Sequence, residues 1–193
     1  MKTAIQIGSA GAFDMDWKAS VEFVLEAERM GIDYVWSAEA WGQDAVTPLA
    51  YLAAITKNVR LGTGIMQISA RAPAMTAMTA MTLSTVSEGR FVLGLGVSGP
   101  QVVEGMHGVP FDSPLGRMRE TVDVIKMALA GEKISYEGRH LRFPLPGGEG
   151  KPIAIDQAPQ PDLPIYLATL GPKSLAYTGE VADGWLGTTF IPE

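Results

Sequence analysis

The sequence predicts an α/β fold in which parallel strands alternate with helices. Short apolar runs recur along the chain and are separated by longer amphipathic stretches of helical length. Glycine and proline, 22 and 13 of the 193 residues, fall at many of the segment ends. Strands separated by helices pair in parallel through right-handed crossovers, and both a doubly wound open sheet and a TIM-type barrel are built in this way.

The first part of the chain contains four strand-and-helix pairs. Strands are expected at 4–7, 34–37, 61–67 and 91–97, and helices at 16–30, 48–56, 73–86 and 114–130. Asp16 is expected to cap the first helix, and Gly31 stands where a terminating glycine belongs. Ala-Met-Thr occurs three times from Ala74 to Thr82, which predicts a core helix packed by adaptable methionines, with a ligand-lining methionine patch as the alternative.

The second part interrupts this alternation and then resumes it. Two short apolar runs at 134–136 and 140–143 predict a hairpin, followed by a loop rich in proline and glycine. A strand at 165–168, a helix at 172–181 and a strand at 185–188 come next. We therefore expect one domain over 1–193 with an inserted hairpin and loop at about 132–164.

Composition narrows the classes of partner. The chain has 15 basic and 21 acidic side chains, a net charge of −6, 47% hydrophobic residues and no cysteine. The chain has no basic run of the kind that binds nucleic acid. Its apolar runs do not approach the roughly 18 residues of a membrane span, and no signal peptide is predicted. Disulfides and thiolate chemistry are excluded, and two distant histidines make a metal site improbable. These features predict a cytoplasmic protein acting on a small molecule.

Polar side chains follow the predicted strands, where active-site groups of a barrel are found. They are mostly uncharged, which suits a flat, hydrogen-bonding ligand better than a metal ion. In chain order they are Ser9, Glu39, Gln67, Ser98, Thr169 and Thr188.

Two of the polar residues beyond the strands are candidate proton carriers. Glu39 stands near Trp36 and Trp41 and could handle a proton, although a capping or salt-bridged acid is equally consistent with the sequence. His107 lies on a glycine-flanked loop, where functional and structural roles are again both open.

The segment from Gly94 to Gly99 matches the G-x-G-x-x-G pattern of dinucleotide-binding folds. It follows the fourth predicted strand and not the first, and no strand ending in an acid lies about 20 residues further on. A glycine-rich strand end that makes room for a ligand at a barrel mouth is therefore preferred.

Four short motifs occur in order along the chain: Tyr34-Val-Trp-Ser-Ala-Glu39, Leu61-Gly-Thr-Gly-Ile65, Ser87-Glu-Gly-Arg-Phe91 and Leu93-Gly-Leu-Gly96. Together they resemble the luciferase-like monooxygenase superfamily. A further pair of segments, at 96–111 and 163–186, is most similar to the branch of that superfamily that uses the deazaflavin F420.

The resemblance implies a TIM barrel with F420 at its mouth and hydride transfer between deazaflavin C5 and a substrate, with FMN as the alternative cofactor. It implies a cis peptide bond at Gly64-Ile65 behind the cofactor ring, with Gln67 at the ring edge. Ser98 and Thr188 would also contact the cofactor. The phosphate loop would consist of Thr169, Leu170, Gly171 and Pro172, to which Lys173 adds charge.

The same resemblance marks Glu39 as the acid beside the ring and leaves His107 as the histidine near the site. Ala40 stands where many members have histidine, and Val102 and Val103 occupy a stretch where asparagine is common. We therefore do not expect this chain to act on a sugar-phosphate substrate.

The length indicates an incomplete barrel. A TIM barrel has eight strand-and-helix units in about 250 residues, and about six units are expected here. We expect a fragment, a trimmed relative or a chain completed by a C-terminal polypeptide. A homodimer is a further possibility that the sequence leaves open. A truncated or non-catalytic flavin-binding barrel is the alternative function.

Overall fold

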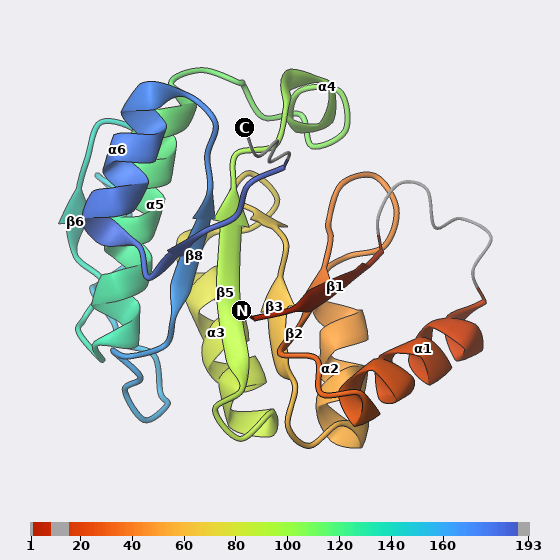
Figure 1. The fold of residues 1–193 in the computed structure, drawn as a ribbon. Coiled ribbons are helices and arrows are strands. Elements are labelled where there is room, and N and C mark those ends of the chain that lie inside the picture. Colours follow the sequence, from red (N-terminus) through yellow and green to blue (C-terminus); the bar gives the residue numbers. More distant parts are fainter. Residues whose placement is uncertain (1, 9–15, 189–193) are drawn as a thin grey trace. The chain divides into compact units, whose positions relative to one another are not determined.

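The computed structural model describes residues 2–8 and 16–188. Helices and strands alternate through most of this range (Figure 1). In chain order the elements are β1 (Ala4–Ile7), α1 (Trp17–Arg29), β2 (Tyr34–Ser37), α2 (Val46–Ile55), β3 (Arg60–Thr63), β4 (Met66–Gln67), α3 (Pro73–Val86), β5 (Phe91–Gly96), α4 (Pro100–Val103), α5 (Pro114–Leu129), β6 (Tyr136–Glu137), β7 (Arg142–Phe143), β8 (Ile165–Ala168), α6 (Pro172–Val181) and β9 (Gly184–Trp185).

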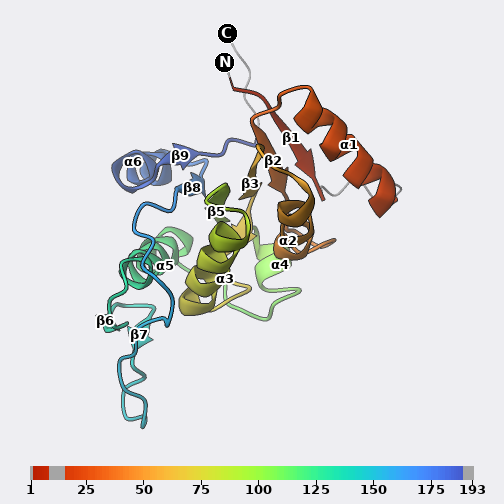
Figure 2. The same ribbon diagram turned by 90° about the horizontal axis from the view of Figure 1, so that it is seen from below.

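The described strands other than β6 and β7 form one parallel sheet. The order of its strands is β1-β2-β3-β5-β8-β9, and β4 pairs with the carboxyl-terminal end of β5. The strands stand in the sheet in chain order, and the hairpin β6-β7 is inserted between the neighbours β5 and β8. Helix α2 packs against β2 and β3, and Figure 2 shows α1 beside β1 at the same end of the sheet.

The chain divides into two compact units. The sheet unit comprises 1–67, 83–96 and 164–193 and holds every strand of the parallel sheet. The helix–hairpin unit comprises 68–82 and 97–163 and holds α4, α5, the antiparallel hairpin β6-β7 and the long loop that follows it. Helix α3 starts in the helix–hairpin unit and ends in the sheet unit.

The core of the sheet unit is centred on β5. All six residues of this strand are buried, as expected for a central parallel strand covered on both faces. Large apolar side chains of the neighbouring strands are fully buried with it, among them Leu61, Met66 and Ile165. The sheet therefore supplies a rigid frame for the loops that leave its strands.

Glu120 organises the helix–hairpin unit. This residue of α5 accepts hydrogen bonds from the backbone N–H groups of Arg139, His140 and Leu141 at 2.9, 2.8 and 2.7 Å. Gly138 leaves room for its carboxylate, because a Cβ there would lie 2.6 Å from Glu120 Cδ. Desolvation raises the pKa of Glu120, but the three N–H donors and the nearby His140 outweigh it, so the pKa lies below the usual value.

The predicted alternation of strands and helices is confirmed, with four local corrections. The last strand, expected at 185–188, is Gly184–Trp185. Asp16 stands at the N-cap of α1 but its side chain makes no capping hydrogen bond. The strand expected at 61–67 is divided into β3 and β4. The short helix α4 was not expected, because the Pro100–Val103 segment is too short for helical periodicity to reveal.

The expectation of a methionine-packed core helix is wrong for two of the three repeated methionines. Met81 is fully buried, whereas Met75 and Met78 are 52% and 41% exposed. A three-residue repeat turns steadily around a helix of 3.6 residues per turn, so successive methionines cannot share one face. The small residues Ala77 and Ala80 occupy the buried face instead.

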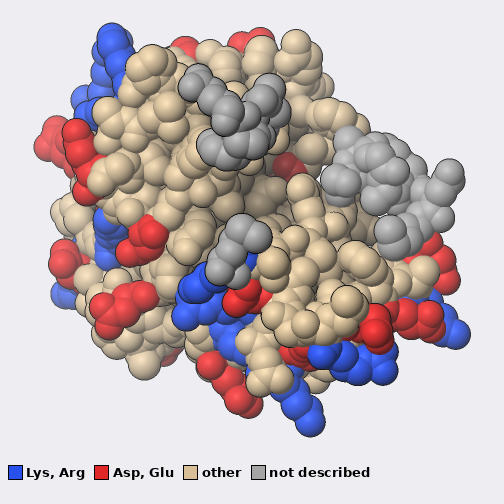
Figure 3. All heavy atoms as spheres, viewed as in Figure 1, with Lys and Arg blue, Asp and Glu red and all other residues tan. Residues whose placement is uncertain are grey.

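The surface carries both signs of charge. On the face shown in Figure 3, acidic and basic side chains are interspersed among uncharged residues. Within 2–8 and 16–188, no helix has the length and apolar character needed to cross a membrane.

Candidate cofactor site

A bulge separates β3 from β4, and the Gly64-Ile65 peptide bond inside it is cis, as the resemblance implied. Gly62 pairs with Val92 of β5 before the bulge, and Met66 pairs with Leu95 of β5 after it. The register between the strands therefore slips by one residue at the bulge.

Thr63 closes the gap in the hydrogen-bond ladder that this slip creates. Its fully buried hydroxyl donates to Gly94 O and accepts from Gly94 N–H, both at 2.8 Å. The backbone groups that lose their ladder partners at the bulge are thus satisfied by a side chain. Sequence reasoning missed this role, and the signal available was a threonine next to glycine inside an apolar strand.

The glycines of β5 make room for the bulge. A Cβ at Gly96 would lie 2.8 Å from the Ile65 side chain, and one at Gly94 would overlap the carbonyl oxygen of Thr63. The G-x-G part of the motif is therefore explained by close packing of strand on strand. The expectation that these two glycines open space for a ligand is corrected, because protein atoms fill that space.

Glu39 and Gln67 meet beside the bulge, at the carboxyl ends of β2 and β4. Glu39 Oε1 accepts from Gln67 N–H at 3.1 Å, and its Oε2 accepts from Ala45 N–H at 3.2 Å. In return Gln67 Nε2 donates to the carbonyl oxygens of Glu39 and Ala40 at 3.3 and 3.2 Å. The two predicted site residues are locked together in a part-buried network.

Unused hydrogen-bonding capacity remains in this region. Gln67 is 1% exposed, and its side-chain oxygen has no hydrogen-bond partner. The Ser37 hydroxyl, fully buried at the end of β2, also lacks a partner. Buried polar groups without partners carry a cost that a bound ligand can relieve, so both atoms indicate where a polar ligand would be held.

The loop before α6 presents a helix N-terminus without a side-chain cap. Gly171 occupies the N-cap position and Pro172 follows it in the helix. Leu170 is 73% exposed, while the buried Thr169 shares a hydrogen bond of 2.7 Å with Thr178 and accepts one of 2.8 Å from Trp185 Nε1 at its carbonyl oxygen. Because the Thr169 hydroxyl is engaged inside the protein, the groups that this loop offers outward are backbone N–H groups.

The remaining predicted residues are placed separately. Ser98, with φ 59°, and His107, whose Nε2 is buried without a partner, belong to the helix–hairpin unit. Their participation with Glu39 of the sheet unit stays a prediction. Thr188 is exposed after β9, and Ser9 lies outside the described residues. Within the described ranges, no three histidine, aspartate or glutamate residues are gathered to hold a metal ion.

The chain belongs to the luciferase-like monooxygenase family, whose model matches residues 2–193. It is 46% identical over its whole length to a Mycobacterium tuberculosis protein that is provisionally named a coenzyme F420-dependent oxidoreductase, and it covers 56% of that protein. It is 35% identical, over 83% of its length, to the 5,10-methylenetetrahydromethanopterin reductase of Methanolobus tindarius, of which it covers 47%. The chain thus spans about half the length of the curated relatives it matches.

Solved structures agree with the fold. The F420-dependent tetrahydromethanopterin reductase of Methanopyrus kandleri matches with a TM-score of 0.77 and 26% identity, covering 96% of this chain and 55% of that one. DmoA from Hyphomicrobium sulfonivorans matches with a TM-score of 0.79 at 15% identity, over 97% of this chain and 52% of DmoA, which shows the fold alone. The predicted barrel class is confirmed, and the curled parallel sheet is a half-barrel of the luciferase-like kind.

Proposed function

We propose that this chain forms the cofactor-binding part of an F420-dependent oxidoreductase that acts on a small organic substrate. The observation that carries the proposal is the Glu39–Gln67 network beside the bulge between β3 and β4, in which the buried side-chain oxygen of Gln67 has no hydrogen-bond partner. The two relatives described above that are at least 35% identical support it, since one is named for F420 and the other for a reductase reaction.

The residues present fit such a cofactor. Gln67 has a buried acceptor oxygen without a partner next to the bulge, which suits a ring that carries N–H donors. Gly64 and Ile65 would support the ring, and Ser98 and Thr188 would flank it. When bound, F420 supplies the hydride chemistry at C5 of its deazaflavin ring, and the protein supplies orientation and electrostatics.

The loop before α6 would hold the cofactor phosphate. An uncapped helix N-terminus favours an anion through its free N–H groups and the helix dipole. Lys173, exposed in the first turn, adds a positive charge there. Leu170 and Gly171 would contribute backbone and not side-chain contacts.

Glu39 and His107 are the proposed proton carriers for the substrate. The two N–H donors hold the Glu39 carboxylate in one orientation, which a general acid or base requires. The Nε2 atom of His107 is buried and has no hydrogen-bond partner within the protein. Ala40 has no titratable side chain, so histidine chemistry directly beside Glu39 is not part of this proposal.

A side-by-side titration tests the function. The protein is titrated with F420 and with FMN, and binding is followed by the cofactor absorbance. We expect saturable F420 binding below about 100 µM, tighter than FMN binding. Lys173→Ala should weaken F420 several-fold, and Lys133→Ala, an exposed lysine elsewhere, should not. Tighter binding of FMN, or no spectral change with F420, would contradict the proposal.

A further inference from the structure

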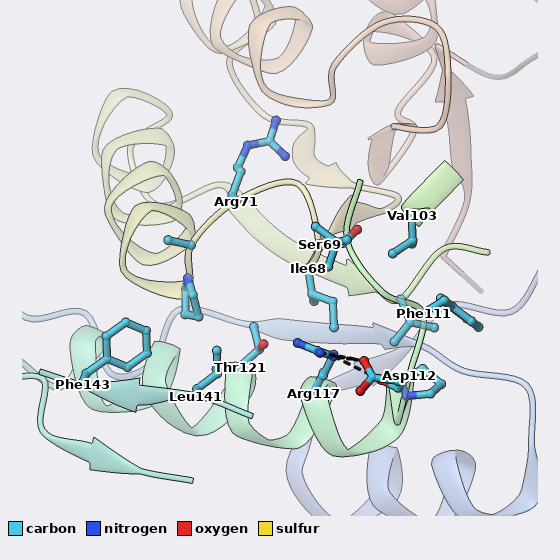
Figure 4. A pocket seen from close by; sticks show the side chains of 15 residues that line it. Ile68, Ser69, Arg71, Val103, Phe111, Asp112, Arg117, Thr121, Leu141 and Phe143 are labelled. Atoms are coloured by element: carbon cyan, nitrogen blue, oxygen red, sulfur yellow. Dashed lines mark hydrogen bonds and ion pairs between the residues drawn. The ribbon is translucent and has the colours of Figure 1, made fainter. Parts of the chain in front are cut away.

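A second pocket lies wholly within the helix–hairpin unit. It has a volume of about 290 Å³ and is formed by the loop that leads into α3, the segment around α4, the first turns of α5 and the β6-β7 hairpin (Figure 4). All of its lining residues lie within 68–73 and 97–143, and none is among the candidate cofactor residues. Two of the lining residues, Ile68 and Val97, directly adjoin Gln67 and Ser98 in the chain.

The body of the pocket is apolar. Ile68, Phe111, Leu141 and Phe143 approach it from different segments. Its volume is at the lower end of the roughly 300–1,000 Å³ of small-molecule sites, so the ligand it suits is a compact one. The mainly apolar lining favours a branched or cyclic hydrocarbon body.

One end of the pocket is polar, and the pocket wall as a whole carries more positive than negative charge. Arg117 donates from Nη2 and Nε to Asp112 Oδ1 at 2.6 and 2.9 Å, and its Nε also contacts the Asp112 carbonyl oxygen at 3.1 Å. The hydrogen bond from Arg117 lowers the pKa of Asp112, which keeps this pair charged at neutral pH. Arg71 also lines the pocket and lies apart from this pair in Figure 4, so the charged side chains of the wall are two arginines and one aspartate.

Two further features favour an anion at the polar end. Helices α3 and α5, of 14 and 16 residues, both begin in the pocket wall at Pro73 and Pro114, and neither has an acidic residue in its first turn. The Ser69 hydroxyl is also part of the wall, and its oxygen is buried without a hydrogen-bond partner. A hydroxyl without a partner in a cavity is a ready donor to an incoming oxygen atom.

We propose that this pocket binds a small organic carboxylate with a compact apolar body. The body fills the space between the hairpin and the α3 loop. The carboxylate binds at Arg117, where it competes with Asp112, and accepts a hydrogen bond from Ser69. The site needs neither F420 nor the residues beside the cis bulge.

The test uses benzoate, benzamide and acetate as probes, with binding measured by calorimetry and by amide chemical shifts. Benzoate combines both features, benzamide lacks the charge, and acetate lacks the ring. We expect benzoate to bind with a Kd of about 1 mM or tighter and the other two at least about tenfold more weakly. Equal binding of benzoate and benzamide, or no benzoate binding, would overturn the proposal.

Three variants locate the charge. Arg117→Gln should weaken benzoate by about tenfold, whereas Asp112→Asn should strengthen it several-fold, because it releases Arg117 from its partner while their backbone contact remains. Arg29→Gln breaks an exposed ion pair with Glu26 outside the pocket and should leave benzoate binding unchanged. If Arg117→Gln does not fold, Asp112→Asn decides: unchanged or weaker benzoate binding refutes the assignment.

Discussion

Replacing Thr63 by valine tests whether a side chain holds the bulge together. Valine keeps the shape of threonine but removes the hydroxyl that bonds both N–H and C=O of Gly94. Thr63 is fully buried, so water cannot replace these bonds. An unsatisfied buried group costs about 1–3 kcal/mol, and two such groups predict a loss of about 2–6 kcal/mol in the free energy of unfolding.

Urea denaturation followed by tryptophan fluorescence measures this loss. With a denaturant slope of about 2 kcal/mol/M, the midpoint of Thr63→Val should fall by about 1–3 M. Thr63→Ser is the matched control, because it keeps the hydroxyl and loses one methyl group, at a cost of about 1 kcal/mol. The reasoning is refuted if the valine variant is as stable as the serine variant, or if the Gly94 amide exchanges no faster in the valine variant.

Three further predictions concern the frame of the two units. Gly94→Ala should destabilise the protein by about 3 kcal/mol in a thermal melt, because the added Cβ would overlap a neighbouring carbonyl and lie 2.8 Å from Leu186 Cδ1. Gly179→Ala, in open space within α6, should instead stabilise the protein by up to about 1 kcal/mol. Desolvation raises the pKa of Glu28, but three backbone N–H donors and a nearby arginine outweigh it, so the pKa is lowered in the folded protein. The stability that the Glu28 carboxylate contributes is therefore complete above its unfolded pKa of 4.5 and is lost as pH falls through the lower folded pKa. Glu28→Gln should flatten the dependence of the unfolding free energy on pH in that acid range. Glu120→Ala should speed amide exchange throughout the hairpin tip at least about tenfold while leaving the exchange of β5 unchanged.

Local patterns were sufficient to predict most elements of this fold. Apolar runs of strand length and amphipathic stretches between them place the strands and helices, because burial on both faces of a parallel sheet and on one face of a helix leaves different periods in the sequence. The polar residues after the strands were also identifiable, since carboxyl ends of parallel strands meet at one edge. Glu39 and Gln67, 28 positions apart, do meet there.

Features set by contacts between distant segments were not predictable in the same way. The role of Gly94 and Gly96 depends on which atoms occupy the space of the missing side chains, and those atoms belong to Thr63 at the end of β3 and to Ile65 in the bulge. A glycine motif alone cannot distinguish a phosphate cradle from close strand packing. The pocket beside Arg117 was missed for the same reason, because its wall is assembled from four separate segments.

The most direct test of the cofactor site is the F420 affinity of Gln67→Leu, compared with the wild-type protein and with Gln157→Leu. Gln67 lies beside the cis bulge with an unpartnered acceptor, whereas Gln157 is half-buried in the helix–hairpin unit and bonded to Thr82. We predict that Gln67→Leu weakens F420 binding by at least about tenfold and that Gln157→Leu leaves it unchanged, with both variants folded by circular dichroism. Wild-type affinity in a folded Gln67→Leu variant would contradict the assignment of this bulge as the cofactor site.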